Sequence, residues 1–153
     1  MQIDFLTNHP QFIPALAAWH HAMWGELDPE ATLQSRIARL KSHTGQPAIP
    51  TTVVAFEDGT LLGSASLVKN DLRTHPHLTP FLASVYVGES FRRRGIASAL
   101  VERVMAEAKG LGVATLYLIT PDQQRLYQRL GWQAQEVVPY RGEDVTLMAT
   151  DLT

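Results

Sequence analysis

The sequence predicts a single α/β (α+β) domain over residues 1–153, with a mixed and mainly antiparallel sheet of about seven strands and helices on both faces. Three observations support this fold class. Apolar runs with the short period of a strand alternate with helical patterns along the chain. Asp58-Gly59 is a hairpin signal between two runs that are typical of strands. A long helical pattern between two apolar runs makes a β-α-β unit, whose two strands are expected to be parallel.

The first half of the chain is expected to form one strand, two helices and a hairpin. A helical pattern follows the first strand and ends near Gly25. Asp28-Pro29, a capping residue followed by proline at the first helical position, predicts the start of the second helix. The expected strands are Gln2–Leu6, Thr51–Glu57 and Thr60–Val68.

The second half is expected to hold the central parallel pair of strands and a final antiparallel pair. The longest helix begins at Gly95 and ends at Gly110 or Gly112. The segment Thr120-Pro121-Asp122-Gln123 has the pattern of a capping box and predicts the start of the last helix, which Gly131 ends. The expected strands are Phe81–Val87, Val113–Thr120, Trp132–Val138 and Asp144–Asp151.

Composition excludes several classes of protein. The chain has no cysteine, which excludes disulfides, thiolate metal sites and a cysteine nucleophile. The net charge of −2 does not favour nucleic acid as a partner. Met1–Thr7 lacks the pattern of a secretory signal and no apolar run has the length of a membrane span, so we expect a cytoplasmic protein that needs no membrane. The pairs His20-His21 and His75–His77 lack a third ligand at a telling spacing, so no metal is expected.

A turn rich in arginine precedes the longest predicted helix. Arg92, Arg93 and Arg94 come directly before Gly95. The first backbone N–H groups of a helix have no partner within it, and the helix dipole places positive charge there. Because glycine has no side chain, a ligand can approach this backbone closely. These features predict a site for phosphate or pyrophosphate, and the alternative is a basic surface turn. Neither a P-loop nor a dinucleotide-binding fingerprint is present.

The segment Arg92-Arg93-Arg94-Gly95-Ile96-Ala97 is similar to the Gln/Arg-x-x-Gly-x-Gly/Ala motif of GNAT acetyltransferases. In that family the motif also lies between a central strand and a long helix, and the order of elements is the one predicted here. The resemblance is strongest over Phe81–Trp132 and weak before residue 50. It implies an acetyl-CoA-dependent N-acetyltransferase with a GNAT-like fold.

The resemblance implies acetyl-CoA as the cofactor. Backbone N–H groups at the helix start would bind its pyrophosphate, and the pantetheine arm would pair with the central strand as an added strand. That strand is expected to splay away from Leu116–Ile119, which admits the thioester. The implied cofactor-binding residues are Val85, Tyr86, Val87, Arg92, Arg93, Arg94, Gly95, Ile96, Ala97 and Ser98.

Leu126-Tyr127-Gln128-Arg129-Leu130-Gly131-Trp132 resembles the family's Tyr-x-x-x-Gly-Phe/Trp segment, which implies that Tyr127 is catalytic. Its phenol would donate a proton or a hydrogen bond to the thiolate that leaves. The N–H of Val85 would polarise the thioester carbonyl. The alternative is that Tyr127 is an aromatic core residue. Many family members carry asparagine near the start of this helix, where Thr120 stands here.

The implied reaction is transfer of an acetyl group to a primary amine by direct attack, since the chain has no cysteine to carry it. In the family the first two helices and the last hairpin shape the acceptor pocket, so Trp24, Glu26 and Tyr140 are candidate substrate-binding residues. The acceptor is either a small amine, which a closed pocket would favour, or a protein N-terminus or lysine, which an open acidic groove would favour. A non-catalytic acyl-CoA-binding regulatory domain is the remaining alternative.

A general base is needed to deprotonate the amine, unless water does so. Glu26, Glu57, His21 and Ser84 are candidates, and no spacing singles one of them out. Dimers are frequent in the family, so a homodimer is one of the expected states, although no surface stripe in the sequence requires it.

Overall fold

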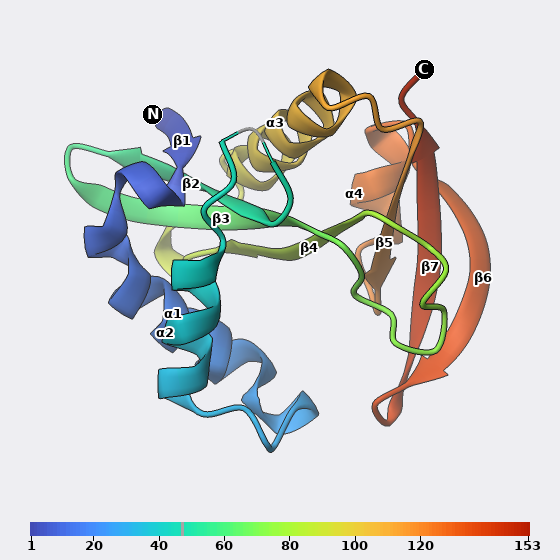
Figure 1. The fold of residues 1–153 in the computed structure, drawn as a ribbon, viewed down its shortest axis with the longest axis horizontal. Helices are drawn as coiled ribbons and strands as arrows, with labels where there is room; N and C mark the ends of the chain where they lie inside the picture. The colour runs from blue at the N-terminus through green and yellow to red at the C-terminus, as the bar shows by residue number, and fades with distance from the viewer. Residues whose placement is uncertain (47) are drawn as a thin grey trace.

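The computed structural model describes residues 1–46 and 48–153, in which seven strands form one sheet in the order β1-β2-β3-β4-β5-β7-β6 (Figure 1). Of the neighbouring pairs, β4 and β5 are parallel and the others are antiparallel, which confirms the mixed sheet with a parallel pair. The strands are β1 (Gln2–Phe5), β2 (Thr51–Glu57), β3 (Thr60–Val68), β4 (Phe81–Val87), β5 (Thr115–Thr120), β6 (Gln133–Tyr140) and β7 (Glu143–Asp151). The α-helices are α1 (Ile13–Trp24), α2 (Leu33–Ser42), α3 (Ile96–Gly110) and α4 (Gln124–Arg129), and the 3₁₀ turns are η1 (Leu6–Asn8), η2 (Pro10–Phe12), η3 (Gly25–Leu27) and η4 (Glu89–Phe91).

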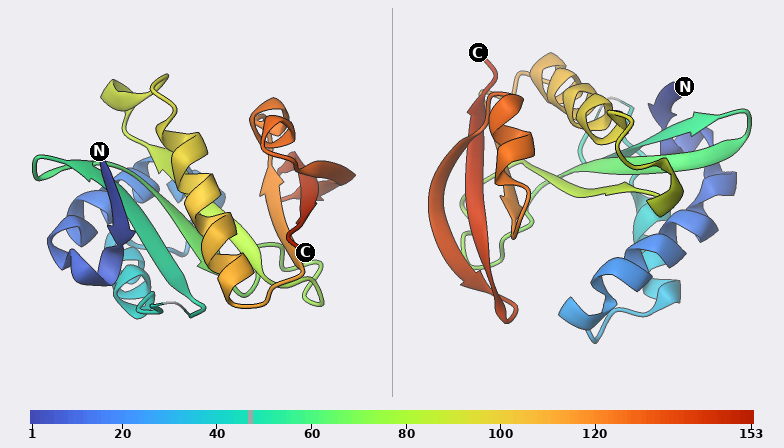
Figure 2. Two further views of the ribbon diagram at one scale, coloured as in Figure 1. Left: turned by 90° about the horizontal axis from the view of Figure 1, so that it is seen from above. Right: turned by 180° about the vertical axis from the view of Figure 1, so that it is seen from behind.

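Helices cover both faces of the sheet, as predicted: α1 and α2 lie on one face, and α3 and α4 on the other (Figure 2). The apolar stripe of α3 packs on the sheet through Leu100, Val101 and Val104, which are almost completely buried. Burying each such side chain stabilises the fold by roughly 1.5–3 kcal/mol. On the other face, Leu16 and Leu40 join α1 and α2 to the strands β2 and β3. Within the described part of the chain, no helix is both long and apolar enough to cross a membrane.

The parallel strands β4 and β5 meet at one point and then separate. Phe81 pairs with Tyr117, and the N–H of Tyr117 donates to the carbonyl oxygen of Pro80 at 3.1 Å. Further along, β4 carries a bulge against β3, and Ser84 within it has a φ of 54°. Bulges bend a strand and redirect its side chains. The sheet therefore opens between β4 and β5 at its centre (Figure 1).

Two helix starts differ from the prediction. Asp28-Pro29 does not begin α2, because Thr32 caps that helix: its Oγ1 accepts from the N–H of Ser35 at 3.0 Å, and Ser35 Oγ accepts from the N–H of Thr32. The predicted capping box at Thr120 forms only in part, and it does not begin the helix. Thr120 Oγ1 accepts from the N–H of Gln123 within a turn, and α4 begins only at Gln124.

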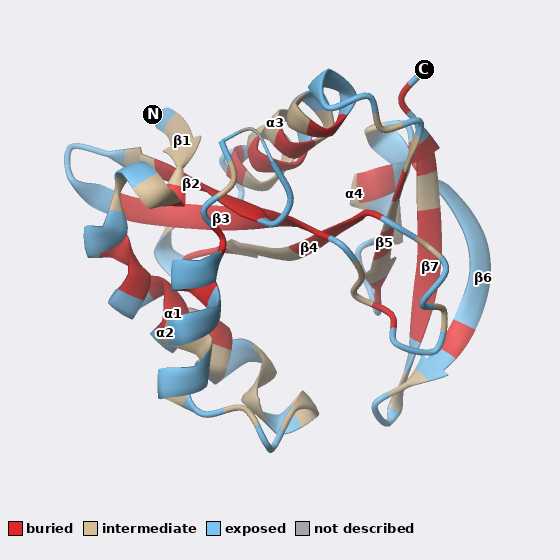
Figure 3. Ribbon diagram, in the orientation of Figure 1, coloured by how far each residue is buried: buried red, intermediate tan, exposed pale blue. Residues whose placement is uncertain are grey.

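The hairpins follow the prediction closely. Asp58 and Gly59 both have positive φ, as a two-residue turn between twisted strands requires. The last hairpin is longer than predicted, because Arg141 and Gly142 alone make its turn and also have positive φ. Strand β7 is largely buried, whereas β6 is the exposed edge of the sheet (Figure 3).

Candidate active site

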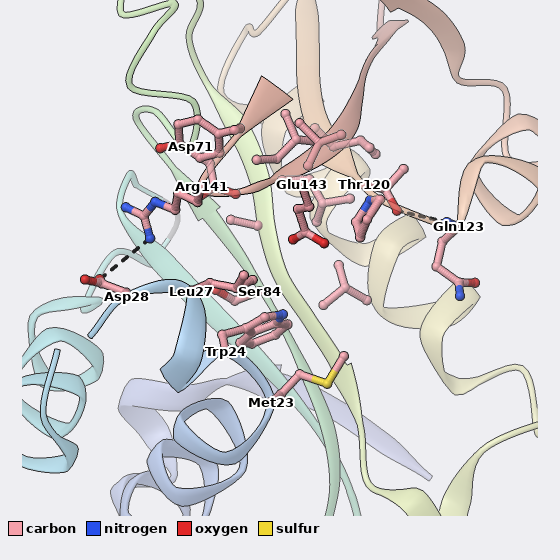
Figure 4. Close-up of a pocket in the computed structure, with 18 of the residues that line it drawn as sticks. Met23, Trp24, Leu27, Asp28, Asp71, Ser84, Thr120, Gln123, Arg141 and Glu143 are labelled. Atoms are coloured by element: carbon pink, nitrogen blue, oxygen red, sulfur yellow. Dashed lines mark hydrogen bonds and ion pairs between the residues drawn. The ribbon is translucent and has the colours of Figure 1, made fainter. Parts of the chain in front are cut away.

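A cavity of about 260 Å³ lies where β4 and β5 separate (Figure 4). Three parts of the chain line it. Strands β4 and β5 contribute Leu82–Val85 and Leu118–Thr120, the region from the end of α1 into α2 lies opposite, and the β6–β7 hairpin closes a third side. Because these parts are far apart in the sequence, only the fold brings their side chains together.

Tyr127 of α4 is one of the residues that line this cavity. Its ring is buried, with an exposed fraction of 7%, and packs edge-on against Trp132 with 6.1 Å between ring centroids. Among the described residues its hydroxyl has no hydrogen-bond partner. Burial, and after it the nearby Asp122, raise the pKa of Tyr127 to about 12. The phenol is therefore neutral and has a proton available for a hydrogen bond into the cavity.

The arginine turn joins β4 to α3 on the surface next to this opening. Arg93 and Gly95 have positive φ, of 67° and 77°, and no side chain caps α3. A Cβ added at Gly95 would meet no atom within 4 Å, so the helix start is open to an incoming group. Arg94 is exposed and its guanidinium lies 5.8 Å from the centroid of the Phe91 ring.

Arg92 behaves differently from its two neighbours. Its Nε donates to the carbonyl oxygen of Val87 at 3.0 Å, and its guanidinium lies over the ring of Tyr86 at 5.5 Å. This side chain therefore fixes the end of β4 to the turn. The positive charge closest to the start of α3 comes from Arg93 and Arg94, together with the backbone N–H groups of Ile96, Ala97 and Ser98.

Of the three predicted acceptor-binding residues, the fold places two in the cavity. Trp24 and Tyr140 line the cavity, from the end of α1 and the end of β6. Glu26 is exposed in η3 and is not among the lining residues. Of the candidate bases, Ser84 lines the cavity, whereas Glu57 pairs with the N-terminal amine of Met1 at 3.4 Å.

The structure adds charged groups that sequence reasoning missed. Asp71, from the loop after β3, and Glu143, at the start of β7, both line the cavity. The carboxylate of Glu143 points into its centre (Figure 4). Asp28 forms an ion pair with Arg141 at 3.7 Å across the gap between η3 and the last hairpin. No motif marks Asp71 or Glu143, because one lies alone in a loop and the other at the start of a strand.

Burial raises the pKa of Asp71 to about 6, although Arg39 and Arg141 nearby favour its charged form. The carboxyl of an aspartate in the unfolded chain titrates near pH 3.8. The folded state therefore holds this proton more tightly than the unfolded state, and the ionised carboxylate at neutral pH destabilises the fold.

We expect the replacement Asp71→Asn to raise the free energy of unfolding by about 1–2 kcal/mol at pH 7.5, since part of the side chain remains solvated and screens the cost. The increase in the free energy of unfolding should be largest above pH 6, become smaller as the pH falls from about 6 to 4, and be absent below that range. Urea unfolding across this range measures it, with Asp144→Asn, on the exposed face of β7, as the matched control. A loss of stability at pH 7.5 would show that the carboxylate is stabilised by its arginine neighbours.

His20, which is buried beside the site, is neutral. Burial lowers the pKa of His20 to about 3, and its Nε2 lies 3.1 Å from the hydroxyl of Ser64. Its ring also packs on Trp24 and Tyr86, with 5.1 and 6.3 Å between centroids. Across the described residues, no group of three His, Asp or Glu side chains is arranged to hold a metal ion.

The fold and the opened parallel pair define a class: this is the architecture of an acetyltransferase. The sequence model of the acetyltransferase (GNAT) family matches residues 13–132, which is most of the chain. The chain belongs to the GNAT acetyltransferase family. No curated protein matches it in sequence.

Solved structures share the fold over the whole chain. A Salmonella typhimurium protein, yncA, solved with its cofactor acetyl-CoA, is 21% identical with a TM-score of 0.78, covering 100% of this chain and 94% of that one. An aminoglycoside 6'-N-acetyltransferase complexed with coenzyme A is 18% identical with a TM-score of 0.78, covering 100% and 98%. Ribosomal-protein-alanine N-acetyltransferase from Brucella melitensis is 20% identical with a TM-score of 0.77, covering 99% of each chain. At these identities the likeness shows the fold.

Proposed function

We propose that this protein transfers an acetyl group from acetyl-CoA to a primary amine by direct attack of the amine on the thioester. The observation that carries the proposal is the opening between β4 and β5, which leads into a cavity lined by Tyr127, whose hydroxyl has no hydrogen-bond partner among the described residues. Membership of the GNAT family supports the acyl-transfer chemistry, and two neighbours in fold were solved with acetyl-CoA and with coenzyme A.

The residues present fit acetyl-CoA. The start of α3 is uncapped, open and flanked by Arg93 and Arg94, which suits the pyrophosphate. Among the described residues, β4 and β5 pair only at Phe81 and Tyr117. The β4 edge from Val85 to Val87 can therefore accept an extended, amide-containing arm as an added strand. When bound, acetyl-CoA supplies an activated acyl group on a sulfur leaving group.

Tyr127 would act as a hydrogen-bond donor to the sulfur. A thiol titrates near pH 8.5, well below the value of about 12 that burial gives this phenol. The proton therefore stays on Tyr127 Oη while its hydrogen bond stabilises the negative charge that develops on the leaving group. The N–H of Val85, next to the bulge in β4, would donate to the thioester carbonyl oxygen.

Asp71 and Glu143 are better placed to receive a proton from the amine than Glu26, Glu57 and His21, because both line the cavity and those three do not. A carboxyl with a pKa of about 6 is ionised at neutral pH and is a stronger base than an ordinary aspartate. Ser84, which also lines the cavity, would serve through a bound water.

The small cavity favours a small amine over a peptide. Sites for drug-sized ligands measure about 300–1,000 Å³, and the cavity of about 260 Å³ must also admit the acetyl end of the donor. The fold neighbours do not decide this point, since one is named for an aminoglycoside and another for a ribosomal protein. The protein N-terminus remains the second candidate acceptor.

Intact-mass spectrometry with acetyl-CoA alone, followed by addition of small primary amines, tests the proposal. Direct attack predicts that the protein gains no acetyl mass without an amine, and that free CoA and an N-acetyl product appear together once it is added. An acetylated protein that then passes its group to the amine would overturn direct attack. Tight binding of acetyl-CoA without any product would favour the non-catalytic domain.

A further inference from the structure

One end of the cavity holds a cluster of three arginines that the proposed chemistry does not use. Arg36 and Arg39 come from α2, and Arg141 comes from the turn between β6 and β7. Burial has the largest effect on the pKa of Arg36 and lowers it; the charge of Asp28 opposes this change, and the charges of Arg39 and Arg141 add to it. Such a concentration of positive charge is costly unless an anion shares the site.

The carboxylates near this cluster balance its charge only in part. Asp28 is in ion-pair contact with Arg141 at 3.7 Å. Asp71 lies near Arg39 and Arg141 and, with a pKa of about 6, is ionised at neutral pH, so two carboxylates stand near three guanidinium groups. Among the described residues, neither Arg36 nor Arg39 has a carboxylate within 4.0 Å.

Arg36 also leaves a donor without a partner. Its Nε donates to Nδ1 of His21 at 3.2 Å, which fixes the guanidinium in place. Its Nη2 is buried and has no hydrogen-bond partner in the part of the chain that the structure describes. A buried donor that stays unsatisfied costs free energy, and more when the group is charged. Arg36 also lines the cavity, so its guanidinium is held where its remaining N–H groups can donate to a planar anion such as a carboxylate.

At the opposite end of the cavity the charged side chains are acidic and not basic. Tyr127 and Asp122 line that end together, and Asp122 acts on the pKa of Tyr127. Glu143 points into the space between the two ends, and among the described residues it has no ion-pair partner. A ligand with an ammonium group at the Glu143 side and an anionic group at the Arg36 side would match this charge distribution.

We propose that the acceptor is a small amino-carboxylate, whose anionic group is bound by Arg36 with Arg39 and Arg141 while its amine faces Glu143 and Tyr127. The inference rests on the proposed acetyl transfer and names the substrate class of that same cavity. It also separates the two acceptor classes, because a protein N-terminus or a lysine side chain carries no free carboxylate beside its amine. Phosphonate shares the relevant chemistry with carboxylate, since both are anions that a guanidinium binds with two hydrogen bonds.

The proposed preference for an anionic acceptor can be tested on the wild-type protein with matched pairs of acceptors. Each standard amino acid is compared with the amine that remains when its α-carboxylate is removed, such as leucine with isoamylamine and phenylalanine with phenethylamine, and release of CoA thiol from acetyl-CoA is followed. For at least one pair, kcat/KM of the amino acid should exceed that of its amine by more than about tenfold, because a charged hydrogen bond to the anion is lost in the amine. The aminophosphonate analogue of the best acceptor then distinguishes carboxylate from phosphonate.

A variant locates the effect on Arg36. Arg36→Gln should remove the preference within the pair, because it raises KM for the amino acid far more than KM for the amine, whereas Arg36→Lys should keep part of the preference. Arg125→Gln, an exposed arginine of α4 outside the cavity, is the matched control and should keep all of it.

Three outcomes would overturn the inference. One is equal or better use of the amines, another is an equal loss for both members of the pairs in Arg36→Gln, and the third is a protein that binds CoA and acetylates none of the amino acids. Binding of CoA is measured first on the same preparation by calorimetry. A failure of the proposed function would appear as absent CoA binding, or as CoA binding with acetylation of neither the amino acids nor the amines. A failure of this inference alone would appear as acetylation of the amines without a preference for the anionic acceptor.

Discussion

Replacing Tyr127 with phenylalanine is expected to lower kcat by about 10²–10³-fold and to leave the affinity for acetyl-CoA unchanged. The substitution removes one hydroxyl that has no partner among the described residues, so the ring and its packing on Trp132 are kept. What is lost is a hydrogen bond that becomes strong only when charge develops on the sulfur, and such a loss lowers kcat and kcat/KM together. Steady-state kinetics with a saturating amine measures it.

Tyr117→Phe is the matched control for this prediction. Tyr117 is half-buried in β5, outside the lining of the cavity, and its ring packs on Phe81 with 5.6 Å between centroids. We expect this variant to retain nearly full activity. Full activity in Tyr127→Phe would instead assign Tyr127 to the core alone, which is the alternative that the sequence left open.

The pH dependence gives a second check on Tyr127. Because burial raises its pKa to about 12, the phenol stays protonated over the range in which the protein is stable. The wild-type rate should therefore show no fall from ionisation of Tyr127 between pH 7 and about 10. A basic limb that disappears in Tyr127→Phe would contradict the role of a neutral hydrogen-bond donor.

Replacing Gly95 with glutamate is expected to weaken binding of acetyl-CoA by at least about 100-fold, as measured by titration calorimetry. The new carboxylate would stand at the uncapped start of α3, where it would repel the pyrophosphate and compete for the same N–H groups. A Cβ at this position meets no other atom within 4 Å, so the side chain itself fits.

A second glycine in the same helix region provides a close control. Gly95 and Gly112 have φ values of 77° and 83°, and an added Cβ meets nothing within 4 Å at either position. Glutamate at either site therefore carries the same charge and a similar backbone cost of roughly 1–2 kcal/mol. Gly112→Glu lies after the other end of α3 and should bind acetyl-CoA normally. Equal weakening by both variants would show that the effect comes from strain or net charge.

The sequence predicted the fold well where local signals and the fold agree. The hairpin at Asp58-Gly59 has the positive φ values that this residue pair permits, and the ends of Phe81–Val87 match β4. Local signals failed where tertiary contacts compete with them. Asp28 resembles a helix cap, but its carboxylate pairs with Arg141 of the last hairpin, and the helix begins after Thr32 instead.

The donor side of the site could be proposed from sequence because its residues form a continuous motif around Gly95. The acceptor side could not. Its charged residues come from separate elements: Arg36 from a helix, Asp71 from a loop and Glu143 from the start of a strand. The sequence around each of them has no pattern that marks a functional site. These residues line one cavity because β4 and β5 separate and because α2 and the last hairpin lie against that opening. Periodicity in the sequence predicts single helices and strands, but it does not predict this tertiary arrangement.

The most direct test of acetyl transfer uses acetyl-CoA with an isotopic label in its acetyl group, a mixture of small primary amines and amino acids, and mass spectrometry of the products. Acetyl transfer by this protein predicts that the label appears on an amine nitrogen, in equal amount to the CoA released, and that Tyr127→Phe slows the appearance of both. Release of labelled acetate with no labelled amine, or no release of CoA from a protein that binds acetyl-CoA, would contradict it.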